Sequence, residues 1–267
     1  MNFDSYIISE TKTSLSMPLL DFKDCHPPRK LGRSKGFKDF KGFTLAETLI
    51  TLAIIGVVAA LTVPNLLNKY TKHTYVVGLK KAYSQLQNAM KMIPITEGCS
   101  AGDYDCAGMF QDRGKATNID EMDFGGNSDK KMIYLLSKQF KVKKFCLTYE
   151  ENECAFVSKA SSNAGFITED GMQYTNSNSA WDAYVDVNGE KGPNKVGRDI
   201  FLFTFAYKDQ NGIQQGTVIP KGSKLDKIYY ENGAFYWKDD NRCTTESVKD
   251  YDLYCTGRVL EEDAMNY

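Results

Sequence analysis

The sequence predicts an α+β fold in which a long N-terminal helix packs against a mainly antiparallel β-sheet head. A mainly apolar run extends from Phe43 to Val63, and apolar residues then recur at helical spacing as far as Ile93. From Phe145 onward, short strand-like segments alternate with turn signals such as Asn211-Gly212. Because the links between these segments are short, we expect antiparallel hairpins.

The apolar run from Phe43 to Val63 predicts a membrane-spanning helix. Its 21 residues include one charged side chain, Glu47, and at about 1.5 Å per residue they span roughly 31 Å, the thickness of a bilayer core. A buried acid costs about 2.5 to 3.5 kcal/mol at mid-bilayer, so Glu47 requires a functional reason. A secretory signal peptide is a poorer explanation, since its apolar core is shorter and ends at a small-residue cleavage site.

Beyond the span, the pattern predicts an amphipathic helix that continues the membrane helix. Its polar face carries lysines and amides, and its apolar face consists of Leu66, Leu67, Tyr70, Leu79, Ala82, Tyr83, Leu86, Ala89, Met90 and Ile93. We expect Pro94 to end this helix, giving an element of roughly 75 Å. Gly56 and Pro64 are the predicted places for a bend or a local loss of helix.

Basic residues precede the span and predict its orientation. One acid, Asp39, accompanies six cations, which are Arg29, Lys30, Arg33, Lys35, Lys38 and Lys41. By the positive-inside rule the N-terminus is cytoplasmic and the head lies outside. The net charge of -1 gives no general attraction to nucleic acid, and the cluster adjoins a membrane span, so a nucleic-acid arm is disfavoured.

The segment around Gly42 and Phe43 resembles the processing site of type IV pilins and type II secretion pseudopilins. Lys41 precedes this pair, Glu47 follows four residues after Phe43, and Pro64 follows the apolar run. The resemblance implies that prepilin peptidase cuts after the glycine and methylates the new N-terminal amine. It also implies assembly into a filament through the N-terminal helix, driven by an inner-membrane platform, with Glu47 pairing with the Phe43 amine of a neighbouring subunit.

This resemblance divides the chain into four predicted segments. Residues 1–42 form a cytoplasmic leader that is removed, unless the true start is Met17. Residues 43–64 form the transmembrane and filament-core helix, residues 65–94 the amphipathic helix, and residues 95–267 the head. The Gly-Phe pairs at Gly36 and Gly165 lack a following apolar run and are not competing sites. The expected location is the bacterial inner membrane, with a single pass and an extracytoplasmic head, and a filament after assembly.

The cysteine count supports cleavage after Gly42. Of seven cysteines, Cys25 leaves with the leader and six remain on the oxidising side. Six cysteines allow 15 pairings, and their clustering favours three short loops, which are Cys99 with Cys106, Cys146 with Cys154 and Cys243 with Cys255. Zinc is the rival explanation, but the chain has no Cys-x-x-Cys and no histidine near a mature cysteine.

The head is expected to be built of one short helix and many strands. Ser128 is a suitable cap for the helix, and residues 239–267 are expected to form a polar loop. The predicted strands are Phe145 to Tyr149, Cys154 to Ser158, Gly165 to Thr168, Met172 to Thr175, Trp181 to Val187, Ile200 to Tyr207, Gly216 to Ile219, Lys227 to Tyr230 and Ala234 to Lys238.

One stretch of the head has the composition of a cation-binding loop. Asp186, Asn188, Asn194 and Asp199 offer hard oxygens, and interspersed glycines allow carbonyls to turn inward, which suits Ca²⁺. The spacing is not that of an EF-hand, although some pseudopilins hold calcium in a similar loop. The other interpretation is a connection between two strands, fixed by an Asn-Gly turn and needing no cofactor.

Catalysis has little support in the sequence. The two histidines are His26 in the leader and His73 just outside the span, so a nucleophilic triad in the head has no base. The acids at 169 and 170, or at 182 and 186, have no spacing that singles them out as a glycosidase pair. The expectation is therefore a structural subunit and not an enzyme.

Two functional alternatives remain open at this stage. A membrane-anchored binding module or adhesin would be processed but would not polymerise. The aromatic cluster around Tyr229, Tyr230, Phe235, Tyr236 and Trp237 is explained by strand packing, or by an exposed strip for carbohydrate or DNA.

Overall fold

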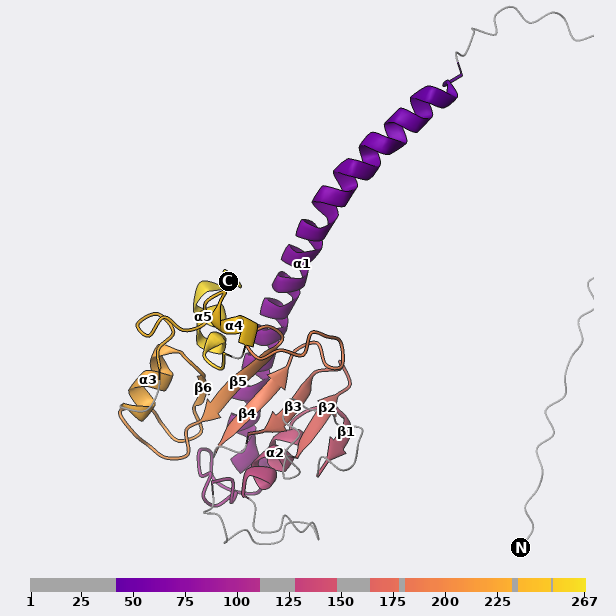
Figure 1. Cartoon of the computed structure of the whole chain (residues 1–267). Coiled ribbons are helices and arrows are strands. Elements are labelled where there is room, and N and C mark those ends of the chain that lie inside the picture. Colours follow the sequence, from indigo (N-terminus) through magenta and orange to yellow (C-terminus); the bar gives the residue numbers. More distant parts are fainter. Residues whose placement is uncertain (1–41, 111–127, 148–163, 178–180, 232–234, 251) are drawn as a thin grey trace, which may run out of the picture. The chain divides into compact units, whose positions relative to one another are not determined.

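The computed structural model describes residues 42–110, 128–147, 164–177, 181–231, 235–250 and 252–267. By contacts the chain divides into two compact units, Met1–Gly56 and Val57–Tyr267. The second unit contains the head, in which the later part of α1 runs along one face of a sheet (Figure 1). The α+β prediction is confirmed.

Helix α1 (Leu45–Thr96) contains both prolines that were expected to disturb it. The predicted loss of helix at Gly56 and Pro64 is wrong, because the helical assignment continues through both. Pro64 removes one backbone hydrogen bond from a 52-residue helix, and its neighbours keep theirs. Pro94 does not end α1 either; the helix stops two residues later, before Gly98, which adopts a positive φ of 78°.

The sheet has six antiparallel strands in sequence order. They are β1 (Val142–Cys146), β2 (Gly165–Thr168), β3 (Gln173–Asn176), β4 (Asp182–Asp186), β5 (Ile200–Phe205) and β6 (Val218–Pro220). The first predicted strand is shifted by three residues, from 145 to 142, and the predicted strand at 154–158 lies outside the described residues. Helix α2 (Ser128–Ser137) occurs where Ser128 predicted a helix and packs near β2 and β3.

Alternate residues of β5 contact opposite sides of the sheet. Phe201, Phe203 and Phe205 belong to the main core with α1, and the Tyr83 ring of α1 stacks on Phe203 at a centroid distance of 5.8 Å. Leu202 belongs to a second cluster on the other face with Tyr184. Because β5 is buried on both faces, its sequence is almost continuously apolar.

Three predictions for the C-terminal part of the head are wrong. The segment expected as a strand at 227–230 lies in helix α3 (Lys224–Tyr230), because the Ser223 side chain caps that helix by accepting from Asp226 N at 3.3 Å. Phe235 to Lys238 is not a strand. The expected C-terminal loop contains α4 (Ser247–Asp250) and α5 (Cys255–Glu262), whose Val259 enters the main core.

Two predicted disulfides form in the structure, Cys99–Cys106 and Cys243–Cys255. Cys146 is also disulfide-bonded, but its predicted partner Cys154 lies outside the described residues. The first bridge closes the loop that follows α1, and the second ties the start of α5 to the preceding segment. Such short-loop bridges contribute very roughly 2 to 4 kcal/mol each.

Candidate processing and assembly site

The predicted cleavage bond lies in non-helical chain just before α1. Gly42, Phe43 and Thr44 are non-helical, the helix begins at Leu45, and the Phe43 side chain is 83% exposed. A Cβ atom added at Gly42 would meet nothing within 4 Å. The fold of the chain therefore does not require glycine at this position, so any such requirement comes from the enzyme that reads it.

Thr44 and Glu47 form a reciprocal capping box at the start of α1. The Thr44 N–H and hydroxyl donate to Glu47 Oε2 at 2.9 and 3.0 Å, and the Glu47 N–H donates to Thr44 Oγ1 at 3.3 Å. Sequence reasoning overlooked this function of Thr44, although Thr-x-x-Glu before an apolar run is its signature. The capping box holds the carboxylate at the helix N-terminus, beside the residue whose amine cleavage would release.

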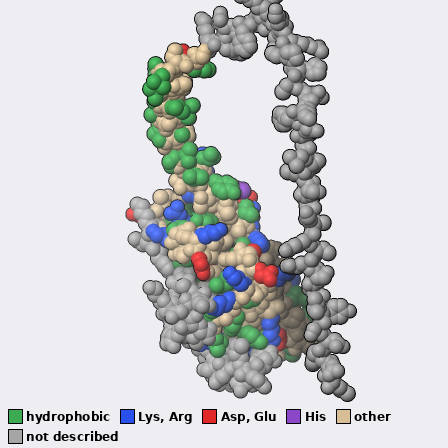
Figure 2. All heavy atoms as spheres, turned by 90° about the vertical axis from the view of Figure 1, so that its right-hand side faces the viewer, with side chains coloured by type: hydrophobic (Ala, Val, Ile, Leu, Met, Phe, Trp, Pro, Cys, Tyr) green, Lys and Arg blue, Asp and Glu red, His purple; other side chains and the backbone are tan. Residues whose placement is uncertain are grey.

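The first half of α1 exposes nearly all of its apolar side chains (Figure 2). α1 is long and apolar enough to cross a membrane, and its most apolar window has no buried residue. The exposed set consists of Leu45, Leu49, Ile50, Leu52, Ile54, Ile55, Val57, Val58, Leu61, Val63, Leu66, Leu67 and Tyr70. This surface requires lipid or another protein chain to cover it.

Polar side chains within the span are satisfied by the helix itself. The hydroxyls of Thr48, Thr51 and Thr62 donate to carbonyl oxygens three or four residues earlier, at 2.8 to 3.0 Å. A hydroxyl bonded in this way can lie in hydrocarbon without an unpaired donor. Glu47 therefore remains the only ionisable side chain between Phe43 and Val63, and Thr44 is its sole side-chain partner in the described part of the subunit.

The candidate calcium loop is held by its own carboxylates. Asp186 Oδ1 accepts from the N–H groups of Asn188 and Gly189, at 3.1 and 2.9 Å. Asp199 is fully buried and accepts from the N–H groups of Asn194 and Lys195, at 2.8 and 2.7 Å. These hydrogen bonds hold the backbone of the connection between β4 and β5. Each carboxylate keeps lone pairs that these bonds do not use.

The Asn194 amide closes the loop on itself. It lies 3.2 Å from Gly189 O and 3.0 Å from Lys191 O, and its nitrogen donates to both carbonyl oxygens. Asn188 Oδ1 is buried without a hydrogen-bond partner among the described residues. The described residues contain no group of three or more histidine, cysteine or acidic side chains placed to hold a metal, so the four calcium ligands stay a prediction.

Asp186 has a strongly raised pKa. Burial is the main cause, the N–H of Asn188 opposes it, and the charge of Asp199 raises it further, to about 7. Two acids that disfavour each other's charge in a buried loop would both be stabilised by a bound cation.

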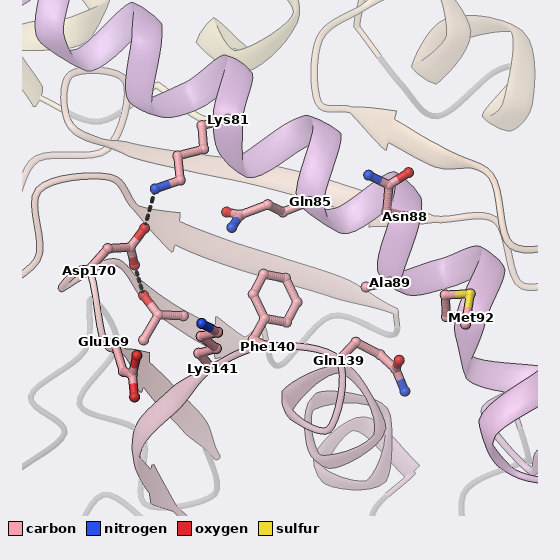
Figure 3. A pocket seen from close by; sticks show the side chains of 11 residues that line it. Lys81, Gln85, Asn88, Ala89, Met92, Gln139, Phe140, Lys141, Glu169 and Asp170 are labelled. Carbon is pink, nitrogen blue, oxygen red and sulfur yellow. Dashed lines mark hydrogen bonds and ion pairs between the residues drawn. The ribbon is translucent and has the colours of Figure 1, made fainter.

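A groove of about 480 Å³ lies between α1 and the end of β2 (Figure 3). Lys81 Nζ pairs with Asp170 Oδ2 at 2.5 Å, and Thr168 donates to the other oxygen of the same carboxylate. Burial alone would raise the pKa of Asp170, but Lys81 and Thr168 together lower it below its ordinary value. Asp170 therefore lacks the raised pKa that a glycosidase acid needs.

The other singled-out side chains have ordinary structural environments. His73 is exposed on α1. Tyr229 is fully buried, so it cannot belong to an exposed aromatic strip. The Tyr236 hydroxyl and Trp237 Nε1 both donate to Glu261 Oε2, at 3.1 and 3.0 Å. The aromatic cluster is thus partly core and partly fixed against α5.

Comparison with known families supports the geometry at the start of α1. The prokaryotic N-terminal methylation motif matches residues 37–63, about a tenth of the chain. Searches for similar proteins of curated function and for similar solved structures found no significant match. The match contains the Gly42-Phe43 bond, the capping box and the apolar run in one segment. The chain therefore carries the prepilin-type cleavage and methylation signature of type IV pilins and pseudopilins.

Proposed function

We propose that this chain is a structural subunit, a pilin or pseudopilin, of a type IV pilus-like or type II secretion filament. The observation that supports this most is the coincidence of the methylation motif with an exposed, non-helical Gly42-Phe43 bond just before a capped apolar helix. Prepilin peptidase would cut this bond and methylate Phe43. The apolar half of α1 would then be covered first by the inner membrane and later by neighbouring subunits.

Glu47 is the proposed assembly contact. Among the described residues its carboxylate accepts only from Thr44, so lone pairs remain for a second partner. The Phe43 amine of an adjacent subunit would supply that partner in a medium of low dielectric, where opposite charges attract strongly. Any other axial offset between helices would leave the carboxylate without this partner, so the pair would also set the register.

Cleavage is tested by co-expressing the full chain with a prepilin peptidase and measuring the mass of the mature N-terminus. We expect a methylated Phe43. Gly42→Ala should block cleavage without affecting the fold, because the added methyl group meets nothing. Gly36→Ala, in the other Gly-Phe pair of the leader, is the matched control and should be processed normally. Any other mature N-terminus would contradict the proposal.

Assembly is tested with Glu47→Gln, which removes the charge while keeping an oxygen that accepts from Thr44 in the capping box. We expect normal cleavage and strongly reduced incorporation into filaments, read as loss of crosslinks between α1 helices in native membranes. Normal incorporation of this variant would exclude the charge pair. Absence of such crosslinks in the wild type would favour the anchored binding module that does not polymerise.

We also propose that the loop after β4 binds Ca²⁺ through Asp186, Asn188, Asn194 and Asp199. Support comes from the buried Asn188 Oδ1, which has no hydrogen-bond partner in the described part of the chain, and from the raised pKa of Asp186. Bound calcium would neutralise the two buried acids and fix the connection between β4 and β5 against α1.

Calcium binding is tested by the melting temperature of the full chain in detergent at pH 7.5, with Ca²⁺ or with a chelator. We expect calcium to raise the melting temperature of the wild type and of Glu190→Gln, an exposed acid of the same loop that serves as the control. Asp186→Asn should lose most of the increase. Equal melting temperatures of the wild type in calcium and in chelator would refute the site.

A further inference from the structure

The groove between α1 and the end of β2 lies in the head, and the proposed function does not use it (Figure 3). Its volume of about 480 Å³ falls within the range of small-molecule sites. It follows α1 from Lys81 to Met92, which is about 17 Å along the helix axis. The groove can therefore hold a short linear ligand. We call it the α1–β2 groove.

The charged side chains of the α1–β2 groove cancel one another. The lining contains two lysines, Lys81 and Lys141, and two acids, Glu169 and Asp170. Lys81 and Asp170 are already paired with each other. A lining without net charge does not concentrate cations, phosphate groups or polyanions. An uncharged ligand therefore suits this groove best.

The Phe140 ring provides an apolar platform in the groove. Two core rings hold it, because the centroids of Phe166 and Tyr174 lie 5.3 and 4.9 Å from its own. Phe140 is nevertheless partly exposed, and Figure 3 shows its ring beside Gln85 and Lys141. A ring that is already fixed loses little freedom when a ligand binds. Its negative face suits the C–H groups on the flat side of a sugar ring.

Two amide side chains of the groove each have one hydrogen bond and a free group of opposite kind. Gln85 Oε1 accepts from the Tyr174 hydroxyl at 3.4 Å, which leaves Gln85 Nε2 to donate. Gln139 Nε2 donates to Thr96 Oγ1 at 2.9 Å, which leaves Gln139 Oε1 to accept. Within the described ranges neither side chain has a further partner. The groove therefore offers one oriented donor and one oriented acceptor.

An acetamido group complements this donor and acceptor. It carries one C=O group, one N–H group and an apolar methyl group, and Ala89 and Met92 add apolar surface to the same lining. The exposed Asn88 amide also lines the groove and has no side-chain partner in the described part of the chain. It can donate to one sugar hydroxyl and accept from another.

A peptide also carries secondary amides, but the backbone groups of this groove are already paired. The Glu169 N–H donates to Lys141 O, and the Thr168 N–H donates to Met172 O, both at 2.9 Å. An extended peptide binds mainly by adding a strand to a free sheet edge. These residues offer no such edge, so the groove favours a ligand that is held by side chains alone.

We propose that the α1–β2 groove binds a short, uncharged oligosaccharide of N-acetylhexosamine units. One sugar ring would lie on Phe140, and the acetamido groups would accept from Gln85 Nε2 and donate to Gln139 Oε1. The head would thereby recognise a glycan, an activity that goes beyond the proposed assembly through the first half of α1.

The test measures binding of tri-N-acetylchitotriose to the full chain by calorimetry, in a detergent without a sugar headgroup. Gln85→Glu keeps an oxygen that accepts from Tyr174 but removes the free donor, so it should fold and bind at least about tenfold more weakly. Gln139→Glu is the matched control. It adds the same charge to the same groove but keeps the free acceptor, and it should bind like the wild type.

Two further ligands test the chemistry of the site. Cellotriose, which lacks the acetamido groups, should bind at least about tenfold more weakly than tri-N-acetylchitotriose, and an acetylated trialanine amide should not compete. Absence of tri-N-acetylchitotriose binding at millimolar concentrations would overturn the site, as would equal affinity of the wild type and Gln85→Glu. A peptide that binds as tightly as the sugar would overturn the glycan assignment. None of these results depends on cleavage or filament formation, so failure here is distinct from failure of the subunit proposal.

Discussion

In the first half of α1, from Leu45 to Tyr70, apolar side chains are exposed on all sides, whereas in the second half most of them form one buried stripe and only Val77, Met92 and Ile95 are exposed among its large apolar side chains. The buried stripe consists of Tyr75, Val76, Leu79, Ala82, Leu86, Ala89, Met90 and Ile93, at spacings of three and four residues. The second half is therefore completed by its own head. The first half needs partners outside the chain, which is the property expected of a membrane anchor and filament core.

The two glycines of α1 differ in the same way as the two halves of the helix, because one has open space beside it and the other has a close neighbour. A Cβ atom at Gly56 would meet nothing within 4 Å, whereas one at Gly78 would lie 3.0 Å from Val187 Cβ. Gly78 thus allows close approach of α1 to the segment after β4. Any packing reason for Gly56 must involve another molecule.

The largest effect should come from truncating the buried stripe. Leu86 is fully buried, so Leu86→Ala should lower the free energy of unfolding of the head by about 2 to 5 kcal/mol. Leu52→Ala, the same change at a side chain that is 66% exposed, should leave it unchanged. Chemical denaturation of both variants in detergent measures the contrast, and a large loss for Leu52→Ala would break the comparison.

The next effect concerns the loop that supports the second half, where Asn188 Nδ2 reaches the Tyr75 hydroxyl at 3.5 Å. The pKa of Asp186 rises from its ordinary 3.8 to about 7 on folding, so between these values the native state binds more protons than the unfolded state. In chelator, stability should therefore fall by a few kcal/mol as the pH rises from 4 to 7 and level off above about 8.

Asp186→Asn should remove that fall in stability with rising pH, and Glu190→Gln should retain it. Denaturant unfolding at several pH values provides the measurement. An unchanged pH profile in Asp186→Asn would show that another group is responsible.

A smaller effect should distinguish the glycines. Gly78→Ala gains about 1 kcal/mol of helix propensity but overpacks against Val187, which costs about 1 to 3 kcal/mol, so we expect a net loss of about 1 kcal/mol. Gly56→Ala should leave the stability of the head unchanged. Thermal unfolding can measure the stability of both variants. A Gly78→Ala variant more stable than the wild type would contradict the expectation, because Val187 would then have shifted at no cost to make room for the added methyl group.

The smallest effect should be local to the first turn. Thr44→Val removes the cap and should destabilise the start of α1 by about 1 kcal/mol, seen as faster hydrogen exchange of the first helical amides. Thr51→Val makes the same change at a hydroxyl that bonds to a carbonyl within the helix, and should leave exchange at the first turn unchanged. Equal exchange in the two variants would contradict the capping function of Thr44.

The sequence by itself determined the features that depend on near neighbours. The long apolar helix, its amphipathic continuation, the methylation motif and two short-loop disulfides followed from local patterns. The capping box was equally local and was overlooked. Such features are predictable because all of their partners lie within about a dozen residues.

Only the tertiary structure decided which apolar residues find a partner within the chain. Leu66, Leu67 and Tyr70 continue the pattern of the buried stripe, yet they remain exposed because the described part of the head buries side chains of α1 only from Tyr75 onward. In the same way, only the fold brings Lys72 to the main-chain oxygens of Met265 and Tyr267, which lie 193 and 195 residues further along the chain. Local propensity does not encode contacts between distant segments, since these arise only when the sheet closes against the helix.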